Sequence, residues 1–92
     1  MPLSPRHLTL TAETIAVVEL DRNFDRIEVL NRDGSAEVFF TTDGSEPGIG
    51  QDGCHILAAA IGAVEVADQT SGTNSVVKLI SAAAVAVSVR GF

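Results

Sequence analysis

The sequence predicts an all-β fold: a small antiparallel β-sandwich of about eight short strands, either jelly-roll-like or immunoglobulin-like. Apolar and polar residues alternate with a period of two along most of the chain, and turn residues interrupt this alternation at intervals of about ten positions. The length of 92 residues suits one domain. Val, Ala, Ile and Leu supply most of the 46% apolar content, with four Phe and neither Trp nor Tyr, which suits a thin β core.

The N-terminal residues 1–12 are expected to form an extended arm, because Pro2 and Pro5 precede an extended segment. Such an arm can add a strand to the open sheet edge of a neighbour. Residues 13–92 are then expected to form the single sandwich domain.

The first half of the chain is expected to contain four strands: His7–Leu10, Glu13–Leu20, Phe24–Asn31 and Ala36–Thr42. In each of the last three strands the alternation places one set of residues on a shared face: Thr14, Ala16, Val18 and Leu20, then Ile27 and Val29, then Val38 and Phe40. Between the last two strands, Asn31-Arg32-Asp33-Gly34 predicts a tight turn, because Asp-Gly accepts the positive φ that such turns require. We therefore expect these two strands to pair as a hairpin.

The second half begins with a glycine-rich acidic loop, Asp43 to Gly53, and continues with four further strands: Cys54–Leu57, Ala63–Ala67, Val76–Ser81 and Val85–Arg90. Their expected inner residues are Val64, Val66, Val77, Leu79, Val85, Val87 and Val89. Leu57 to Ala63 has good helix propensity, but it is short and Gly62 interrupts it, so we predict a turn. Asp68 to Asn74 is expected to be another, polar turn.

Composition and charge disfavour several classes of function. The chain has 12 acidic and 6 basic residues, a net charge of −6, and its cations are scattered, whereas a nucleic-acid binder needs them clustered. No apolar run approaches the roughly 20 residues of a membrane span. Cys54 is the only cysteine and no leader is evident, so synthesis in a reducing compartment is expected.

No constellation of catalytic or metal-ligating residues is evident, so we expect a protein that is not an enzyme and needs no cofactor. His7 and His55 are far apart in the sequence. Cys54 and His55 are neighbours in a predicted strand, so their side chains point to opposite faces of the sheet and cannot bind one metal ion together. Cys54 lacks a cationic setting and is expected to be a packed thiol. The acidic segment Asp43 to Glu46, with Asp52, lacks the alternating oxygen ligands of a calcium loop and is read as a turn.

Two predicted strands are apolar on both faces, which implies that both faces are covered. Phe39 points away from Val38, and Val76 and Ile80 flank Lys78 on the face opposite Val77. Either the long loop or another subunit covers these side chains. The candidate partner contacts are Leu8, Leu10, Phe39, Val76, Ile80 and Phe92, and the candidate loop contacts are Asp43, Glu46 and Ile49.

A local resemblance concerns Val38-Phe-Phe-Thr-Thr-Asp-Gly-Ser-Glu-Pro47. This stretch resembles the strand and turn of the small β-sandwich modules appended to chitobiase and related glycosidases. Those modules usually have an aromatic pair before the turn and a tyrosine after it; this chain has Phe39-Phe40 and no tyrosine. The resemblance implies a carbohydrate-binding accessory module.

A broader resemblance covers most of the chain. The segments Phe24–Gly34, Val38–Gly44, Ser75–Ile80 and Val87–Phe92 are together similar to short virion proteins of tailed phages of actinobacteria. This implies a non-enzymatic structural protein of the phage particle: a capsid decoration or minor capsid protein or, as the alternative, a minor tail or head–tail connector protein. The implied partners are other copies of itself and a major capsid or tail protein. The implied location is the virion, after synthesis in the host bacterial cytoplasm.

Overall fold

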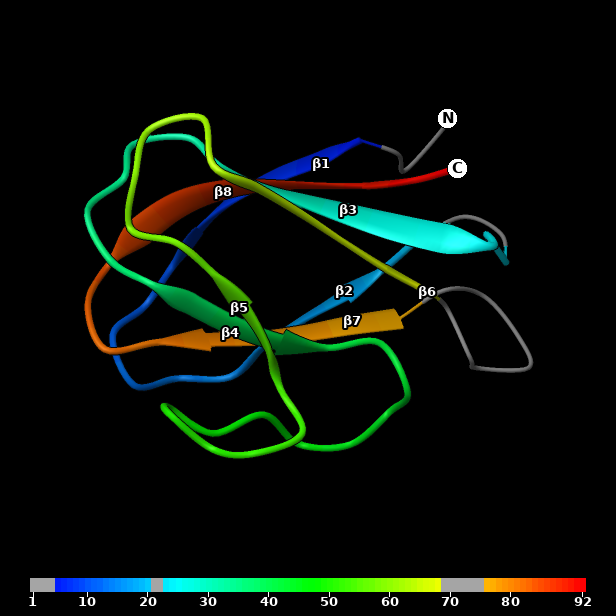
Figure 1. Cartoon of the computed structure of the whole chain (residues 1–92), viewed down its shortest axis with the longest axis horizontal. Coiled ribbons are helices and arrows are strands. Elements are labelled where there is room, and N and C mark those ends of the chain that lie inside the picture. Colours follow the sequence, from blue (N-terminus) through cyan, green and yellow to red (C-terminus); the bar gives the residue numbers. More distant parts are fainter. Residues whose placement is uncertain (1–4, 21–22, 69–75) are drawn as a thin grey trace.

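A computed structural model describes residues 5–20, 23–68 and 76–92 of the protein. These residues form two four-stranded antiparallel sheets packed face to face (Figure 1). Sheet A has the order β1-β8-β3-β6 and sheet B the order β2-β7-β4-β5. The strands are β1 (Arg6–Leu10), β2 (Ala16–Glu19), β3 (Arg26–Asn31), β4 (Val38–Thr41), β5 (His55–Leu57), β6 (Val64–Asp68), β7 (Val76–Ser81) and β8 (Val85–Gly91).

The topology distinguishes between the two predicted kinds of sandwich. The first half of the chain pairs antiparallel with the second half, in the pairs β1/β8, β2/β7, β3/β6 and β4/β5. This long two-stranded ribbon is rolled up, so that β8 also pairs with β3 and β7 with β4. Two four-stranded sheets with this order form a jelly roll, whereas a seven-stranded immunoglobulin sandwich divides four and three. The predicted antiparallel β-sandwich is confirmed.

The core lies between the sheets and is made of the alternate residues that the strands turn inward. Strands β3, β7 and β8 follow the predicted alternation, with Val77, Leu79 and Val87 fully buried. The buried apolar cluster consists of Leu10, Val18, Leu20, Ile27, Val29, Val38, Phe40, Leu57, Ala67, Val77, Leu79, Val85, Val87 and Val89.

The predicted hairpin between Phe24–Asn31 and Ala36–Thr42 is wrong. β3 pairs with β6 and β8 in sheet A, and β4 pairs with β5 and β7 in sheet B. Gly34 does adopt a positive φ of 71°, but its turn carries the chain across from one sheet to the other. Asn31, fully buried, anchors this crossing. Its Nδ2 donates to the carbonyl oxygens of Ala36 (3.0 Å) and Ala58 (2.9 Å), and its Oδ1 accepts from the Gly34 N–H (2.8 Å).

The predicted inner face of β6 is also wrong. Val64 and Val66 are 47% and 43% exposed. Val66 lies opposite Glu28 on β3, and its neighbour Ala67 lies opposite Ile27. The side chains of Ala67 and Ile27 are buried in the core. The prediction placed the valines inside because the other face of this strand carries only alanine and acidic residues. The register with β3 instead turns Ala67 into the core and the valines to solvent.

Several boundaries differ from the predicted ones. β2 begins at Ala16, because Glu13 has a φ of 59° and interrupts the extended backbone that was predicted from that residue. The turn predicted over Leu57 to Ala63 is confirmed, since residues 58–63 connect β5 to β6. Asp68 is the last residue of β6, and the rest of the turn predicted over Asp68 to Asn74 lies outside the described residues.

Part of the predicted N-terminal arm is a strand of the sandwich. β1 pairs with β8 over five residues, and Leu10 lies in the core. Residues 1–4 of the predicted arm lie outside the described residues.

Candidate functional site

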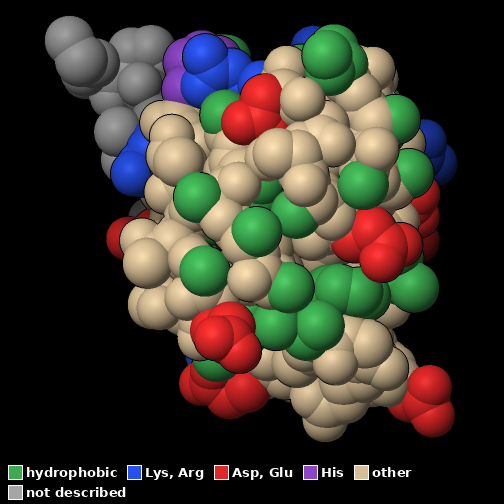
Figure 2. All heavy atoms as spheres, turned by 90° about the vertical axis from the view of Figure 1, so that its left-hand side faces the viewer, with side chains coloured by type: hydrophobic (Ala, Val, Ile, Leu, Met, Phe, Trp, Pro, Cys, Tyr) green, Lys and Arg blue, Asp and Glu red, His purple; other side chains and the backbone are tan. Residues whose placement is uncertain are grey.

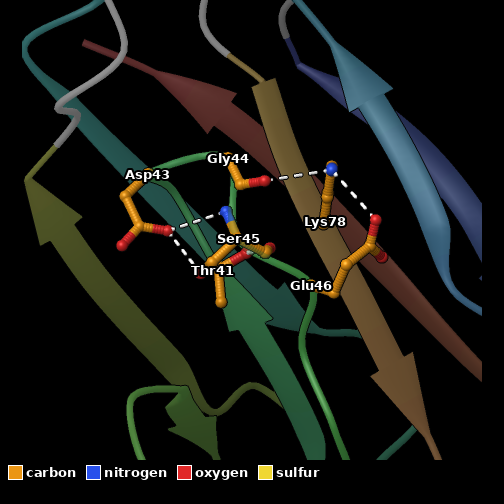
Figure 3. Close-up of polar contacts among 6 residues, drawn as sticks. All are labelled: Thr41, Asp43, Gly44, Ser45, Glu46 and Lys78. Carbon is orange, nitrogen blue, oxygen red and sulfur yellow. Dashed lines mark hydrogen bonds and ion pairs between the residues drawn. The ribbon is translucent and has the colours of Figure 1, made fainter.

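The long loop after β4 is held by hydrogen bonds at its start (Figure 3). The Asp43 carboxylate accepts from the backbone N–H (3.0 Å) and the hydroxyl (2.6 Å) of Ser45. Thr41 Oγ1 donates to the Ser45 carbonyl oxygen (2.6 Å). Lys78, on the outward face of β7, donates to the Gly44 carbonyl oxygen (3.0 Å) and contacts Glu46 Oε1 (3.4 Å). These contacts fix the beginning of the loop against sheet B.

The same contacts set the charge of Asp43. The Ser45 hydroxyl and then the Ser45 N–H donate to its carboxylate and lower the pKa of Asp43 below the ordinary value of 3.8; His55 lowers it further. The group is therefore anionic at neutral pH. Of the two other candidate loop contacts, Glu46 is bonded to Lys78, and Ile49 is 44% exposed.

A hollow of about 280 Å³ lies beside the start of this loop, lined by Thr41, Thr42, Asp43, Gly53, His55 and Asp68. The His55 ring packs on Phe40 at a centroid distance of 5.2 Å. The Thr42 hydroxyl donates to the Asp68 carbonyl oxygen (2.7 Å), and that bond ties the sheets together. Within the described part of the chain, no three His, Cys, Asp or Glu side chains gather closely enough to hold a metal ion. Cys54 is half-buried, with its Sγ 3.8 Å from the Gly48 carbonyl oxygen.

The outward face of sheet B, the sheet B face, carries the strongest apolar signal outside the core. All four strands of the sheet contribute apolar outward-pointing side chains: Val17, Phe39, Ile56, Val76 and Ile80. Glu19, Thr41 and Lys78 point outward among them. Phe39 lies opposite Ile56 on one side and Ile80 on the other. Phe39 is only 6% exposed although it is outside the core cluster, whereas Val17 is 60% and Ile56 55% exposed. The face is therefore mostly apolar, and partly open to solvent.

The six predicted partner contacts do not form one surface. Phe39, Val76 and Ile80 share the sheet B face. Leu8 and Leu10 point inward from β1, because they lie opposite Val87 and Val85, whose side chains fill the core. Phe92 is 49% exposed beyond β8, with the Arg90 guanidinium 5.2 Å from its ring centre.

Sequence reasoning missed two exposed members of the sheet B face, Val17 and Ile56. Both follow the pattern that singled out Phe39: an apolar residue next to an apolar inward residue, here Val18 and Leu57. The pattern was present in the sequence, but it does not distinguish the exposed outward residues Val17 and Ile56 from the buried Phe39.

The outward-facing side of sheet A is called the sheet A face. Unlike the sheet B face, it has protruding valines beside a hollow. Val64 and Val66 protrude from the edge strand β6. Across β3, a hollow of about 260 Å³ is lined by Pro5, His7, Glu28, Leu30, Ser88 and Arg90. Two polar contacts border it: Arg90 with Glu28 (2.9 and 3.3 Å), and His7 Nδ1 with the Ser88 hydroxyl (2.7 Å).

One end of the sandwich, which Figure 2 shows, consists of turns. Hydrophobic side chains are spread over this end among backbone and scattered acidic residues (Figure 2). The turns before β6 and β8 expose alanines and Ile61, which is 79% exposed. Ile61 belongs to the turn between β5 and β6 and to neither sheet face, so a substitution there serves as a control for changes on the two faces.

No known protein family, curated protein or solved structure matches this chain. In the described residues, no helix is long and apolar enough to cross a membrane.

Proposed function

We propose that this protein is a non-enzymatic structural protein of a phage particle, a capsid decoration or minor capsid protein that docks on the shell through its sheet B face. The observation that carries the docking is the exposure of Val17 and Ile56 beside half-buried Val76 and Ile80. An antiparallel sheet with one face in the core ordinarily turns polar residues to solvent on the other. Apolar side chains gathered on one outward face are instead typical of a protein–protein contact.

The assignment to a phage particle rests on the resemblance to short virion proteins that segments such as Phe24–Gly34 suggest, and no match to a known protein supports it. The fold agrees with it, because double-sheet jelly rolls occur in viral capsid domains. A fold by itself does not determine function, so this agreement is an analogy. The net charge of −6 supports the proposal in a second way, since an acidic surface does not attract the packaged nucleic acid. A minor tail or head–tail connector protein would use the same face on a different partner.

The carbohydrate-binding alternative requires an exposed aromatic platform. Phe39 and Phe40 supply the resemblance to chitobiase-type modules, but they are 6% and 0% exposed. Neither ring is available to stack on a sugar. Jelly rolls also occur in lectins, so glycan binding is retained as an outcome of the test below.

The proposal is tested by co-sedimentation with purified shells and tails of a tailed actinobacterial phage. The wild-type chain should bind shells at a fixed stoichiometry, and Ile56→Lys should reduce binding at least tenfold, because it places a charge in the apolar contact. Ile61→Lys is the matched control, since it adds the same charge on an exposed isoleucine away from both faces, and it should bind normally.

Three outcomes decide between the candidates. Binding to tails but not shells would replace the decoration role with the tail role. Binding to neither, together with retention on a polysaccharide column, would favour the glycan module. Equal loss of shell binding in both variants would refute the assignment of the sheet B face.

A further inference from the structure

The sheet A face carries a ridge and a hollow side by side. The ridge is formed by Val64 and Val66 on β6. The hollow lies on the other side of β3, above β8. It exists because the outward residues of β8 next to His7 and Leu30 are small: Ala86 is half-buried, and Ser88 is 9% exposed.

The strand order places ridge and hollow symmetrically about β3. Leu30 lies opposite Val64 on one side and opposite Ser88 on the other. Glu28 lies opposite Val66 and Arg90 in the same way. A twofold axis that runs parallel to β3, above the sheet A face, therefore places the β6 of one copy over the β8 of the other. This operation seats each ridge over the other copy's hollow, so that the contact is made twice.

We propose that two copies of this protein form a twofold dimer in which the Val64–Val66 ridge of each copy fills the Ser88 hollow of the other. The partner is a second copy because the same face carries both the ridge and the hollow that the ridge fits. The dimer uses the sheet A face, and the proposed shell contact uses the sheet B face, so the two contacts are compatible in one particle and are tested separately.

The charges on the sheet A face favour the same partner. The face has two arginines, Arg26 and Arg90, and two acids, Glu28 and Asp68, joined as the pairs Arg26–Asp68 and Arg90–Glu28. It is therefore neutral in a chain whose net charge is −6. Two acidic chains repel one another through most orientations, and a neutral face removes that penalty from the contact.

The expected dimer is weak. Four strands spaced about 4.8 Å apart make a face narrower than about 20 Å. Such a face buries less than the roughly 800 Å² per partner of a standard stable interface. Association is therefore expected to depend on concentration, and to be strengthened where copies are held close together on a particle.

Sedimentation velocity over a concentration series tests the dimer. With increasing concentration, the average mass of the sedimenting wild-type protein should rise from that of one chain toward that of two. Val66→Lys should lower the association constant at least tenfold, because the twofold axis places residue 66 opposite the partner's Arg90. The same substitution places the new ammonium beside Glu28 of its own chain, which supports folding. Ile56→Lys, also on an exposed edge-strand residue but on sheet B, should dimerise like the wild type.

Cross-linking tests the geometry directly. A mixture of the Val64→Cys and Ser88→Cys variants, each in a Cys54→Ser background, should be cross-linked into a dimer by a bis-maleimide that spans about 10 Å, the spacing of two sheets packed face to face. Each variant carries one thiol, so every cross-link joins two chains. Either variant alone should cross-link several-fold less.

A monomer at all concentrations, or a dimer that Ile56→Lys abolishes and Val66→Lys preserves, would overturn the inference. Shell binding by Val66→Lys without dimerisation would leave the proposed function intact. Conversely, a dimer that ignores shells would refute the shell contact alone.

Discussion

Replacing Asn31 with alanine should destabilise the domain more than its single polar side chain would suggest. The side chain is fully buried and makes three hydrogen bonds, to Gly34, Ala36 and Ala58. A buried hydrogen bond contributes about 1 kcal/mol net, and an unsatisfied buried partner costs a further fraction of its desolvation. Asn31→Ala should therefore lower the free energy of unfolding by about 3 kcal/mol, a large share of the roughly 5–15 kcal/mol of a whole domain.

Asn31→Asp distinguishes lost hydrogen bonds from lost volume. The aspartate retains an oxygen for the Gly34 N–H, but it turns an oxygen toward the two carbonyl oxygens that Asn31 Nδ2 now reaches. Burial and these two acceptors raise the pKa of the new carboxyl in the folded state. The folded state then binds the proton more tightly than the unfolded state. The variant should therefore be least stable at neutral pH, and should recover relative to the wild type as the pH falls toward the ordinary carboxyl pKa.

The measurement is urea unfolding followed by far-ultraviolet circular dichroism, since the chain has no Trp or Tyr for fluorescence. Glu37→Ala, an exposed change in the same connection, is the control and should stay within about 0.5 kcal/mol of the wild type. A cost below about 1 kcal/mol for Asn31→Ala would refute the reasoning, because it would mean that the three bonds contribute less than one ordinary bond.

Three further predictions concern the loop and turns. Phe39→Ala should cost about 3 kcal/mol in thermal or urea unfolding, because the ring is buried; a cost near zero would mean that the ring makes no stabilising contacts. Gly34→Ala should destabilise more than Gly44→Ala in the same assay: both glycines have positive φ, but only at Gly34 would a Cβ meet backbone, 2.5 Å from the Ile61 nitrogen, whereas at Gly44 it meets nothing within 4 Å. Equal costs would exclude the clash. Asp43 should titrate below 3.8 by NMR, and Ser45→Ala should raise its pKa because the largest stabilising contact is removed. Since the folded pKa is lowered, the stability from this turn is present above the ordinary pKa and lost as pH falls through the folded value; an unmoved midpoint in Ser45→Ala would contradict this.

The sequence contained enough information for the fold class and most of the core. Period-two alternation in β3, β7 and β8 is local, and inward positions such as Ile27, Leu79 and Val87 follow from it directly. The turn at Gly34 was also predictable, because Asp-Gly favours a positive φ wherever it occurs. What the turn connects was not predictable, because the hydrogen bonds of Asn31 reach to Ala58, 27 residues away.

Some residues of the candidate surfaces were predictable from the sequence and others were not. Phe39, Val76 and Ile80 were identified by their two-sided apolar strands, and they share one face. Leu10 was assigned to a partner contact because it lies in the predicted N-terminal arm, but pairing with β8 turns it into the core. The sheet A ridge was hidden because valines in β6 were expected inside.

The sequence by itself determined that this protein is a small antiparallel β-sandwich with a net charge of −6, because alternation and turn residues act locally and the net charge is a simple sum. Only the tertiary structure decided that the sandwich is a jelly roll, that Phe39 is covered and that Val64 and Val66 face outward. These properties depend on which strands pair and in which register, and a register shift of one residue exchanges the two faces of a strand. Registers are set by contacts between distant segments, such as Val66 with Glu28 and Asn31 with Ala58.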